Sequence, residues 1–382
     1  MDALERTTSL TNLYRAMRKC CKGVMWKASV SNYRQHHLRR LLKLKKALIN
    51  GKYRQSKGTH FKVYEPKERD IVSTLFKDRV PITSLIDNYL YDEVCLKFET
   101  ENCACQKGKG TDYARNLLKA LMRYMYSLYG TNGAVLSVDI HHFFASIRHD
   151  IAKEVMDVRV SDEFAIGMVH GDIDTCDGDI GIDLGSPMNQ LIALAMLDDL
   201  DKRLRQSPVV FVRYMDDIII LGKSKDILKD VLEIVKEELD IKALTLNSKK
   251  THISPITKPI SFLGYSFLIH KTGKITMRPL KKKVAKRRRK LKRQAQLVIK
   301  GVISKQKFAE IYKGGRDHFK KGTRSTLLKM DAYFNALMEE INMQEEIIEL
   351  RKLVEKLESE VFELKAEVAK LKMDKEEDQD VE

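Results

Sequence analysis

Two apolar runs that flank a pair of aspartates place the strongest constraint on how this chain folds. The segment VVFVRYMDDIIILG (209–222) is strongly apolar on both sides of Asp216 and Asp217. Apolar runs of this length are typical of buried strands, so the segment predicts a β-hairpin with the acidic pair at its tip. Another apolar run, AVLSVDI (134–140), predicts a buried strand that ends near Asp139.

These three carboxylates have the chemistry of a centre for two divalent cations. Phosphoryl transfer between nucleotides uses two such ions about 3.5–4 Å apart, one at the attacking oxygen and one at the triphosphate. Mg²⁺ takes a few carboxylate oxygens and keeps water and phosphate as its other ligands, with Mn²⁺ as an alternative ion. Adjacent negative charges between apolar flanks are costly unless a cation balances them. A turn that uses Asp only for local hydrogen bonds is the structural alternative.

A second acidic cluster lies in the segment LGSPMNQLIALAMLDDLDKRL (184–204), where a Gly-Pro turn leads into a predicted amphipathic helix. The cluster consists of Asp198, Asp199 and Asp201. Because Lys202 and Arg203 stand beside these carboxylates, we expect them to form a solvated helix face and not a metal site.

The charge balance points to a polyanionic partner. The formal net charge is +17 for 382 residues, and clustered Lys and Arg displace counterions from phosphates. A highly charged soluble protein without such a partner is the alternative. The six cysteines have no zinc-like spacing, which favours free thiols in a reducing cytoplasm. No stretch reaches the ~20 apolar residues of a membrane span, so we expect a cytoplasmic protein without membrane contact.

Basic residues recur in the other segments. Residues 38–48 place Leu at helical spacing with Arg and Lys between, which predicts an amphipathic helix with a basic outer face. The segment HFKVYEPKERDIV (60–72) predicts a β-hairpin around Pro66. Residues 82–128 have a mostly helical pattern that the loop CQKGKGT (105–111) interrupts. The segment KKKVAKRRRKLKR (281–293) opens a helical stretch to about residue 340.

A heptad pattern fills most of the C-terminal segment. The a positions are Ile347, Val354, Val361 and Val368, and the d series is Met343, Leu350, Leu357, Leu364 and Leu371. β-branched residues at a with Leu at d favour a parallel two-stranded coiled coil. The g positions Glu346, Glu360 and Glu367 would then face Arg351, Lys365 and Lys372 at e of the partner helix. A single helix packed on the protein's own body is the alternative.

Several motifs in a fixed order resemble those of reverse transcriptases. FVRYMDDIII is similar to the YxDD hairpin of that family, and SVDIHHFFASI to its first metal-binding strand. FLGYSF resembles the primer-grip hairpin, and YEPKERDI with KDRV resembles the fingers motif. The resemblance covers about residues 10–330. It implies that Asp139, Asp216 and Asp217 are the catalytic carboxylates and bind Mg²⁺.

The resemblance implies further roles at the nucleotide's phosphates. Arg69 with Lys67, or with Lys62 as the alternative lysine, matches the fingers residues that neutralise the incoming triphosphate. Lys250 in LNSKKT matches a lysine near the pyrophosphate leaving group and is a candidate general acid, with Lys249 as the alternative.

The resemblance also implies contacts with the nucleotide and the nucleic acid. Phe144 matches a steric gate whose ring would collide with a ribose 2′-OH, and a core aromatic beside Phe143 is the alternative. Leu184 and Gly185 match residues at the templating base pair. The matches in the primer and template motifs are Gln190, Gly264, Lys107 and Lys109, the lysines lying in a loop whose glycines permit close approach to phosphates.

The run LGSPMNQ (184–190) bears on the branch of the family. An aliphatic residue before the glycine and a closing Gln resemble the bacterial and phage enzymes of diversity-generating retroelements, whose usual ending is Ser-Gln. Asn189 departs from that pattern, which leaves a defence-associated or other bacterial reverse transcriptase as the alternative.

The fold that the resemblance implies is an α+β right-hand polymerase. Its parts are a helical N-terminal extension (1–58), fingers (59–133), a palm with an antiparallel sheet (134–278), a helical thumb (279–340), a coiled coil (341–373) and an acidic tail (374–382). The implied function is RNA-templated DNA synthesis, with an RNA template, a DNA or RNA primer and dNTPs. Homo-oligomerisation through the coiled coil and an accessory retroelement protein are further expected partners. A non-catalytic nucleic-acid-binding scaffold and an RNA-dependent RNA polymerase are the competing hypotheses.

Overall fold

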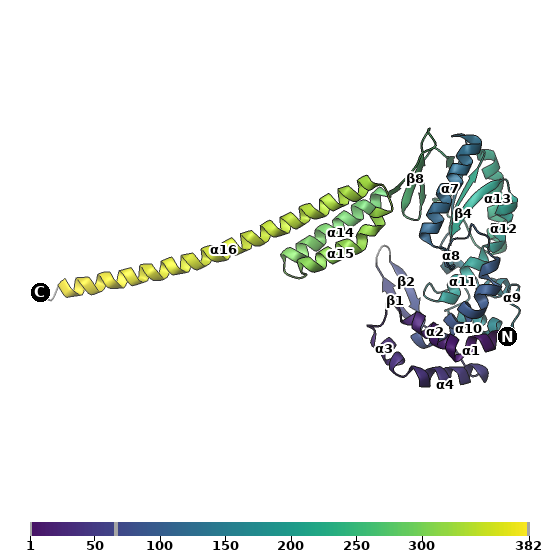
Figure 1. Ribbon diagram of the computed structural model, residues 1–382, viewed down its shortest axis with the longest axis horizontal. Coiled ribbons are helices and arrows are strands. Elements are labelled where there is room, and N and C mark those ends of the chain that lie inside the picture. The colour runs from purple at the N-terminus through teal and green to yellow at the C-terminus, as the bar shows by residue number, and fades with distance from the viewer. Residues whose placement is uncertain (1, 65–67, 380–382) are drawn as a thin grey trace. The chain divides into compact units, whose positions relative to one another are not determined.

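A four-stranded antiparallel sheet carries the predicted acidic hairpin in the computed structural model, which describes residues 2–64 and 68–379 (Figure 1). The strand order is β4-β5-β3-β6. The strands are β3 (Ala134–Asp139), β4 (Val209–Tyr214), β5 (Asp217–Gly222) and β6 (His252–Pro255). The middle of β5 is at most 1% exposed, as expected for an apolar strand with neighbours on both sides. Both predicted apolar runs are therefore strands of one sheet.

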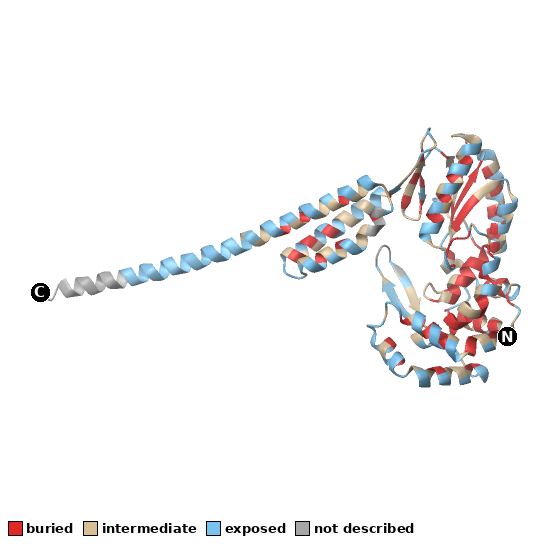
Figure 2. Ribbon diagram, viewed as in Figure 1, coloured by how far each residue is buried: buried red, intermediate tan, exposed pale blue. Residues whose placement is uncertain are grey.

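Helices cover this sheet and extend its core. Helix α7 packs against β4 and β5, and α13 packs against β3, β5 and β6. Figure 2 shows buried residues concentrated on the sheet and on the neighbouring helices. The helices between the first hairpin and β6 are α5 (Phe76–Leu85), η1 (Ile86–Leu90), α6 (Tyr91–Glu93), η2 (Cys95–Lys97), α7 (Thr111–Tyr129), α8 (Phe143–Ser146), α9 (His149–Asp157), α10 (Glu163–Ile173), α11 (Pro187–Met196), α12 (Asp198–Gln206) and α13 (Lys225–Ile241).

The N-terminal segment is helical, as predicted, and leads into the expected hairpin. Its helices are α1 (Ala3–Thr8), α2 (Leu10–Cys21), α3 (Ala28–Gln35) and α4 (His37–Ile49). Helix α4 buries only Leu41 and Leu48, while Leu38 is 69% exposed, so its apolar contact is narrower than the predicted stripe. Strands β1 (Thr59–Val63) and β2 (Arg69–Ser73) pair antiparallel. Lys67 lies outside the described residues.

The chain divides into two compact units. Unit 1 comprises Met1–Leu263 and Leu268–Ile275, and unit 2 comprises Gly264–Phe267 and Thr276–Glu382. A three-stranded sheet, β7 (Ile260–Phe262), β8 (Tyr265–Ile269) and β9 (Ile275–Pro279), contains the boundary between them. No helix in the described ranges is long and apolar enough to cross a membrane.

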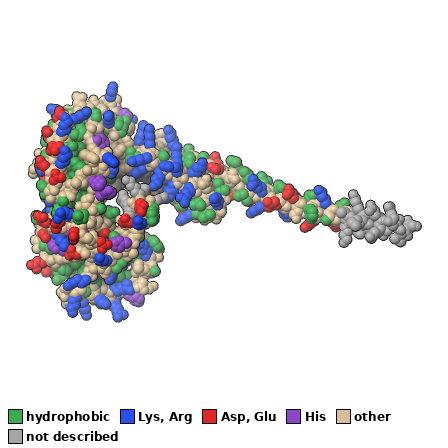
Figure 3. All heavy atoms as spheres, turned by 180° about the vertical axis from the view of Figure 1, so that it is seen from behind, with side chains coloured by type: hydrophobic (Ala, Val, Ile, Leu, Met, Phe, Trp, Pro, Cys, Tyr) green, Lys and Arg blue, Asp and Glu red, His purple; other side chains and the backbone are tan. Residues whose placement is uncertain are grey.

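A three-helix bundle makes up most of unit 2. It consists of α14 (Lys281–Ile299), α15 (Lys305–Lys320) and the first part of α16 (Arg324–Gln379). Its core includes Leu291, Phe308, Met330, Leu337 and Ile341. Figure 3 shows Lys and Arg side chains gathered on this bundle, in agreement with the basic sequence that opens α14. Beyond the bundle α16 continues without a break, and its side chains become exposed (Figure 2).

Candidate active site

Strand register brings two of the predicted carboxylates together. Asp139, the last residue of β3, lies directly opposite Asp217, the first residue of β5. Asp217 also pairs with Tyr214 across the β4–β5 hairpin, so Met215 and Asp216 form a two-residue loop. Met215 has a φ of 58°, a conformation that costs a non-glycine residue free energy and needs support from its surroundings. The hairpin tip is thus the place where the acidic residues gather, as predicted.

The electrostatics of Asp217 reflect this gathering. Burial, followed by the negative charges of Asp216 and Asp139, raises the pKa of the Asp217 carboxyl to about 7. The backbone N–H of Leu263 and the positive charge of Lys250 act in the opposite direction. The side chains therefore form an electronegative site that a cation would stabilise.

Asp139 is held by residues of the loop before β6. Lys250 Nζ lies 2.8 Å from both carboxylate oxygens of Asp139, and Asn247 Nδ2 donates to Asp139 Oδ2 at 2.9 Å. The backbone N–H of Asn247 donates to the Asp139 carbonyl at 2.8 Å. Lys250, the predicted general acid, thus contacts one of the predicted metal-binding carboxylates and remains 57% exposed. Asn247 was missed by the sequence reasoning, although it belongs to the same LNSKKT segment.

The donor set suits a hard divalent cation. Three carboxylates near one hairpin tip offer the oxygen ligands that Mg²⁺ prefers, and Lys250 pairs with one of them, Asp139. Within the described ranges, no three His, Cys, Asp or Glu side chains already form a metal-binding group. The chemistry of the residues present nevertheless fits such an ion, because buried like charges are stabilised by a bound cation.

The prediction for the second acidic cluster was wrong. Asp201 is fully buried and the Asp198 side chain is 4% exposed, while only Asp199 is substantially solvated at 40%. Helix α12 packs against α13 and β4, so the face that carries Asp201 points into the protein. The expected solvated face is wrong because α13 and β4 cover this side of α12, and Arg213 of β4 pairs with Asp201.

Arg213 is the partner of Asp201 and a residue that sequence reasoning overlooked. Its Nε lies 2.7 Å and 2.9 Å from the two Asp201 oxygens, and both side chains are 0% exposed. Nη1 of Arg213 donates to the carbonyl of Met215 at 3.2 Å, and Nη2 donates to the carbonyl of Leu194 in α11 at 3.3 Å. The buried ion pair therefore supports the strained loop that carries Asp216. A lone Arg within the apolar run VVFVRY was the available signal.

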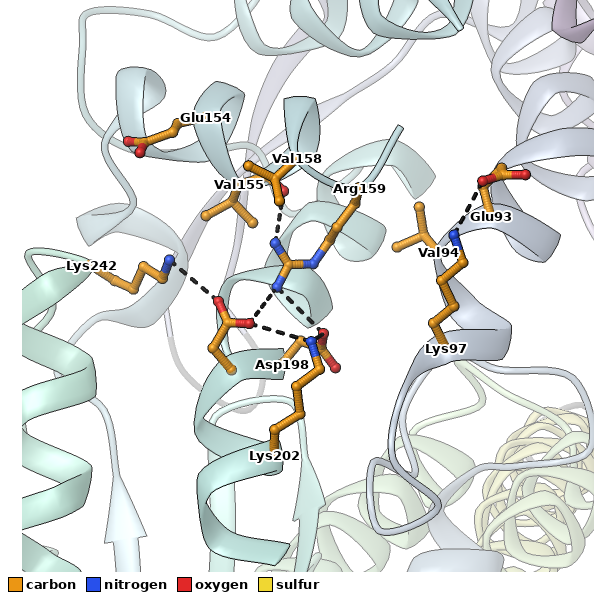
Figure 4. Close-up of a pocket in the computed structure, with 11 residues that line it drawn as sticks. Glu93, Val94, Lys97, Glu154, Val155, Val158, Arg159, Asp198, Lys202 and Lys242 are labelled. Carbon is orange, nitrogen blue, oxygen red and sulfur yellow. Dashed lines mark hydrogen bonds and ion pairs between the residues drawn. The ribbon is translucent and has the colours of Figure 1, made fainter. Parts of the chain in front are cut away.

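The other members of the acidic cluster line a charged pocket of about 280 Å³ (Figure 4). Arg159 Nη2 lies 3.0 Å from Asp199 Oδ1, Lys202 Nζ lies 2.7 Å from Asp198 Oδ2, and Lys242 Nζ lies 3.5 Å from Asp199 Oδ2. None of the three predicted metal-binding carboxylates lines this pocket. It is an ion-pair network separate from the candidate active site.

Gly185 makes a close backbone contact with the β1–β2 hairpin. A Cβ built on Gly185 would lie 2.0 Å from the carbonyl oxygen of Val72 in β2, so no larger residue fits. Nη2 of Arg79 donates to the Gly185 carbonyl at 3.3 Å. Arg69, the predicted triphosphate ligand, lies in the same strand β2, and its side chain is outside the described part of the structure. Gly185, the predicted nucleotide-binding glycine, is thus the point where the LGSPMNQ segment contacts the β1–β2 hairpin.

Local sequence explains how α11 starts after this glycine. Ser186 is the N-cap and its hydroxyl accepts from the Met188 N–H at 3.1 Å, with Pro187 in the first turn. Leu184 is half-buried just before the cap. One turn further on, Gln190 Oε1 accepts from the Cys105 thiol at 3.4 Å, beside a pocket of about 360 Å³ that Lys107 also lines.

The remaining predicted residues have definite surroundings. Phe144 in α8 is half-buried, and the centre of its ring lies 5.5 Å from the centre of the buried Phe143 ring. Lys107 Nζ lies 4.0 Å from the centre of the Tyr91 ring. Lys109 Nζ donates to backbone carbonyls of its own loop, the nearest that of Asn102 at 2.9 Å. Gly264, in unit 2, has a φ of 87°. The roles predicted for these residues stay predictions.

The comparison with protein families finds one family for the middle of the chain. Residues 82–267 match the family model described as reverse transcriptase (RNA-dependent DNA polymerase). This range contains the β3 strand, the β4–β5 hairpin and the Lys250 loop. These residues are a reverse transcriptase domain. The domain supports an RNA-directed DNA polymerase activity, which is a nucleotidyl transfer.

Solved structures of telomerase show a distant likeness. Apo telomerase from Candida tropicalis has a TM-score of 0.43 and 13% identity over 64% of this chain and 53% of that chain. The same enzyme without its C-terminal domain has a TM-score of 0.42 and 13% identity over 63% of this chain and 60% of that chain. Telomerase from Candida albicans in complex with the TWJ fragment of telomeric RNA has a TM-score of 0.44 and 11% identity over 75% and 55%. The chain thus spans only 53% to 60% of the telomerase chains, and no curated protein matches it.

Proposed function

We propose that this reverse transcriptase domain copies an RNA template into DNA, extending a DNA or RNA primer with dNTPs. The observation that carries the proposal is the strand register that sets Asp139 opposite Asp217, next to Asp216 on the hairpin loop. Asp139, Asp216 and Asp217 would hold two Mg²⁺ ions, with Mn²⁺ as the alternative. When bound, the ions would activate the primer 3′ oxygen and neutralise the triphosphate.

The chain's own residues supply the remaining steps of this proposal. Lys250 is within 2.8 Å of Asp139 and 57% exposed, so its ammonium group can reach a leaving pyrophosphate and donate a proton to it. Arg69, with Lys67 or Lys62, would neutralise the triphosphate. Phe144 would exclude the ribose 2′-OH, which favours deoxynucleotides over ribonucleotides.

A right-hand arrangement of subdomains belongs to the same proposal. We assign residues 59–133 to fingers, 134–278 to a palm and 279–340 to a thumb. The palm assignment is supported by the antiparallel sheet that carries the carboxylates. The thumb assignment is supported by the three-helix bundle with its basic α14, which suits contact with a nucleic-acid backbone. Lys107 and Lys109 would flank the template.

The LGSPMNQ motif supports a place in the diversity-generating retroelement branch. The resemblance sets Leu184 at the templating base pair, where its side chain would make an apolar contact and no hydrogen bond. This branch implies an accessory retroelement protein as a partner. A defence-associated or other bacterial enzyme is the alternative, because Asn189 departs from the branch pattern. The heptad seam from Met343 to Leu371 adds a coiled-coil element to the proposed enzyme.

Primer extension tests the proposal. The chain is incubated with a primed RNA template, dNTPs and Mg²⁺, and Asp216→Asn is compared with Asp226→Asn. Asp226 is an exposed residue of α13 that pairs with Lys229, and it serves as the charge-matched control. We expect Asp216→Asn to abolish extension while a binding titration shows nearly unchanged affinity for template–primer. Full extension by Asp216→Asn contradicts the metal assignment, and no extension by the unmodified chain favours the non-catalytic scaffold.

A further inference from the structure

The part of α16 from Met343 to Val368 presents an apolar stripe to solvent. Met343, Leu350, Val354, Leu357, Val361, Leu364 and Val368 are each between 49% and 61% exposed. They occupy the a and d positions of one heptad frame, so they lie on one side of the helix. Shallow grooves of about 360 and 410 Å³ lie along this stripe, the first lined by Ile347, Leu350 and Val354 and the second by Val354, Leu357 and Val361 among others.

The stripe lies on the opposite side of α16 from the side that packs in the bundle. Met330, Leu337 and Ile341 are buried against α14 and α15. A helix turns by about 100° per residue, so the step from Ile341 to Leu350 is a rotation of about 180° and the step to Val354 is about 220°. The helix therefore changes its apolar side at about residue 342. A partner helix can cover the stripe without displacing the helices that already pack on α16.

Charges beside the stripe identify the partner. In a parallel pair each g residue faces the e residue five positions later in the partner helix. A second copy of this chain would set Glu346 against Arg351, and Glu360 against Lys365, in both directions across the pair. Leu353 is the one uncharged residue among the g positions from 346 to 360, and it would face Glu358 of the partner helix. In an antiparallel pair g faces g and e faces e, which would set Glu against Glu and Lys against Lys or Arg.

We infer that α16 binds α16 of a second copy as a parallel, in-register coiled coil. Each bundle of α14, α15 and α16 then lies on the outer side of its own helix, away from the shared seam. The β-branched residues at a and the leucines at d favour two strands over three or four. This dimer rests on residues outside the catalytic site, so the inference is independent of whether the proposed DNA synthesis is correct.

The full chain is the material for the first test. Light scattering should give twice the chain mass of 44.1 kDa. Val354→Lys/Val361→Lys should give the chain mass, because it buries charge in the seam, while the matched control Ser359→Lys on the outer face of the helix should remain dimeric. Circular dichroism of each variant establishes that the helix content is kept. A monomeric unmodified chain, or a dimeric Val354→Lys/Val361→Lys, overturns the inference.

A charge exchange tests the partner and its direction. Glu346→Lys/Glu360→Lys and Arg351→Glu/Lys365→Glu should each dimerise more weakly alone, and an equal mixture should regain a dimer that contains one of each. Self-association of either variant as strong as that of the unmodified chain overturns the charge pairing. Ile347→Cys, near the start of the seam, should form a disulfide across a parallel pair, while Glu349→Cys on the outer face should not. Absence of the Ile347→Cys cross-link in a dimeric sample overturns the parallel direction. Primer extension on the same samples reports separately on the proposed function.

Discussion

The buried Asp201–Arg213 pair makes a quantitative prediction for Asp201→Asn. Both side chains are 0% exposed, and two hydrogen bonds of 2.7 and 2.9 Å join Arg213 Nε to the carboxylate. Removing one member of a buried pair leaves the other charge without compensation, which commonly costs about 3–5 kcal/mol. Since a domain is stable by only about 5–15 kcal/mol, the loss is a large part of the total. At about 2–4 °C per kcal/mol for a domain of this size, we expect the melting temperature to fall by about 10 °C.

The assay is thermal unfolding followed by circular dichroism, with Asp226→Asn as the exposed control. The control should melt within about 1 °C of the unmodified chain, because isolated surface pairs contribute little. The double variant Asp201→Leu/Arg213→Met removes both charges and should recover much of the lost stability. It cannot restore the hydrogen bond to the Met215 carbonyl, so its polymerase rate should stay low although it folds. Equal melting temperatures of Asp201→Asn and the control would refute the reasoning.

Three further substitutions test other parts of the site. Phe144→Ala should raise ribonucleotide incorporation relative to deoxynucleotide incorporation in single-nucleotide assays, and an unchanged ratio would make Phe144 a core residue. Gly185→Ala should lower activity and stability together, because its Cβ would clash with the Val72 carbonyl; near-normal extension and melting would show that β2 can move away. Leu184→Gln should lower misincorporation, most visibly opposite template adenine, when the complementary DNA is sequenced. Some activity should be lost, because burying an amide without a hydrogen-bond partner costs about 1–3 kcal/mol. An unchanged error spectrum would remove Leu184 as a fidelity determinant.

The local part of the site was predictable because it depends on short segments. The apolar runs on both sides of Asp216 and Asp217 predict a buried hairpin, and the structure contains that hairpin. The run that ends at Asp139 became the neighbouring strand for the same reason. The basic N-terminal helices and the β1–β2 hairpin also follow from local patterns.

The features that local sequence patterns did not predict depend on contacts between different helices and strands. Asp201 of α12 looked solvated because its sequence neighbours are charged, yet its partner Arg213 lies in strand β4 and both side chains are buried. The close approach of Gly185 to Val72 joins segments more than a hundred residues apart, and no local pattern reports it. In α16 the heptad pattern predicted the helix, but only the burial of Ile341 showed that the seam faces away from the bundle.

The most direct test of the central claim is a titration with Mn²⁺ followed by electron paramagnetic resonance, in the presence of template–primer and dNTP. Mn²⁺ reports occupancy of the site without requiring turnover. We predict two bound ions per chain for the unmodified protein and for Asp226→Asn, and a loss of binding for Asp139→Asn and for Asp217→Asn. Those two carboxylates face each other across β3 and β5, so either change should disturb the same centre. Equal Mn²⁺ binding by all four proteins would contradict the claim that the hairpin tip and the end of β3 form one metal-dependent site.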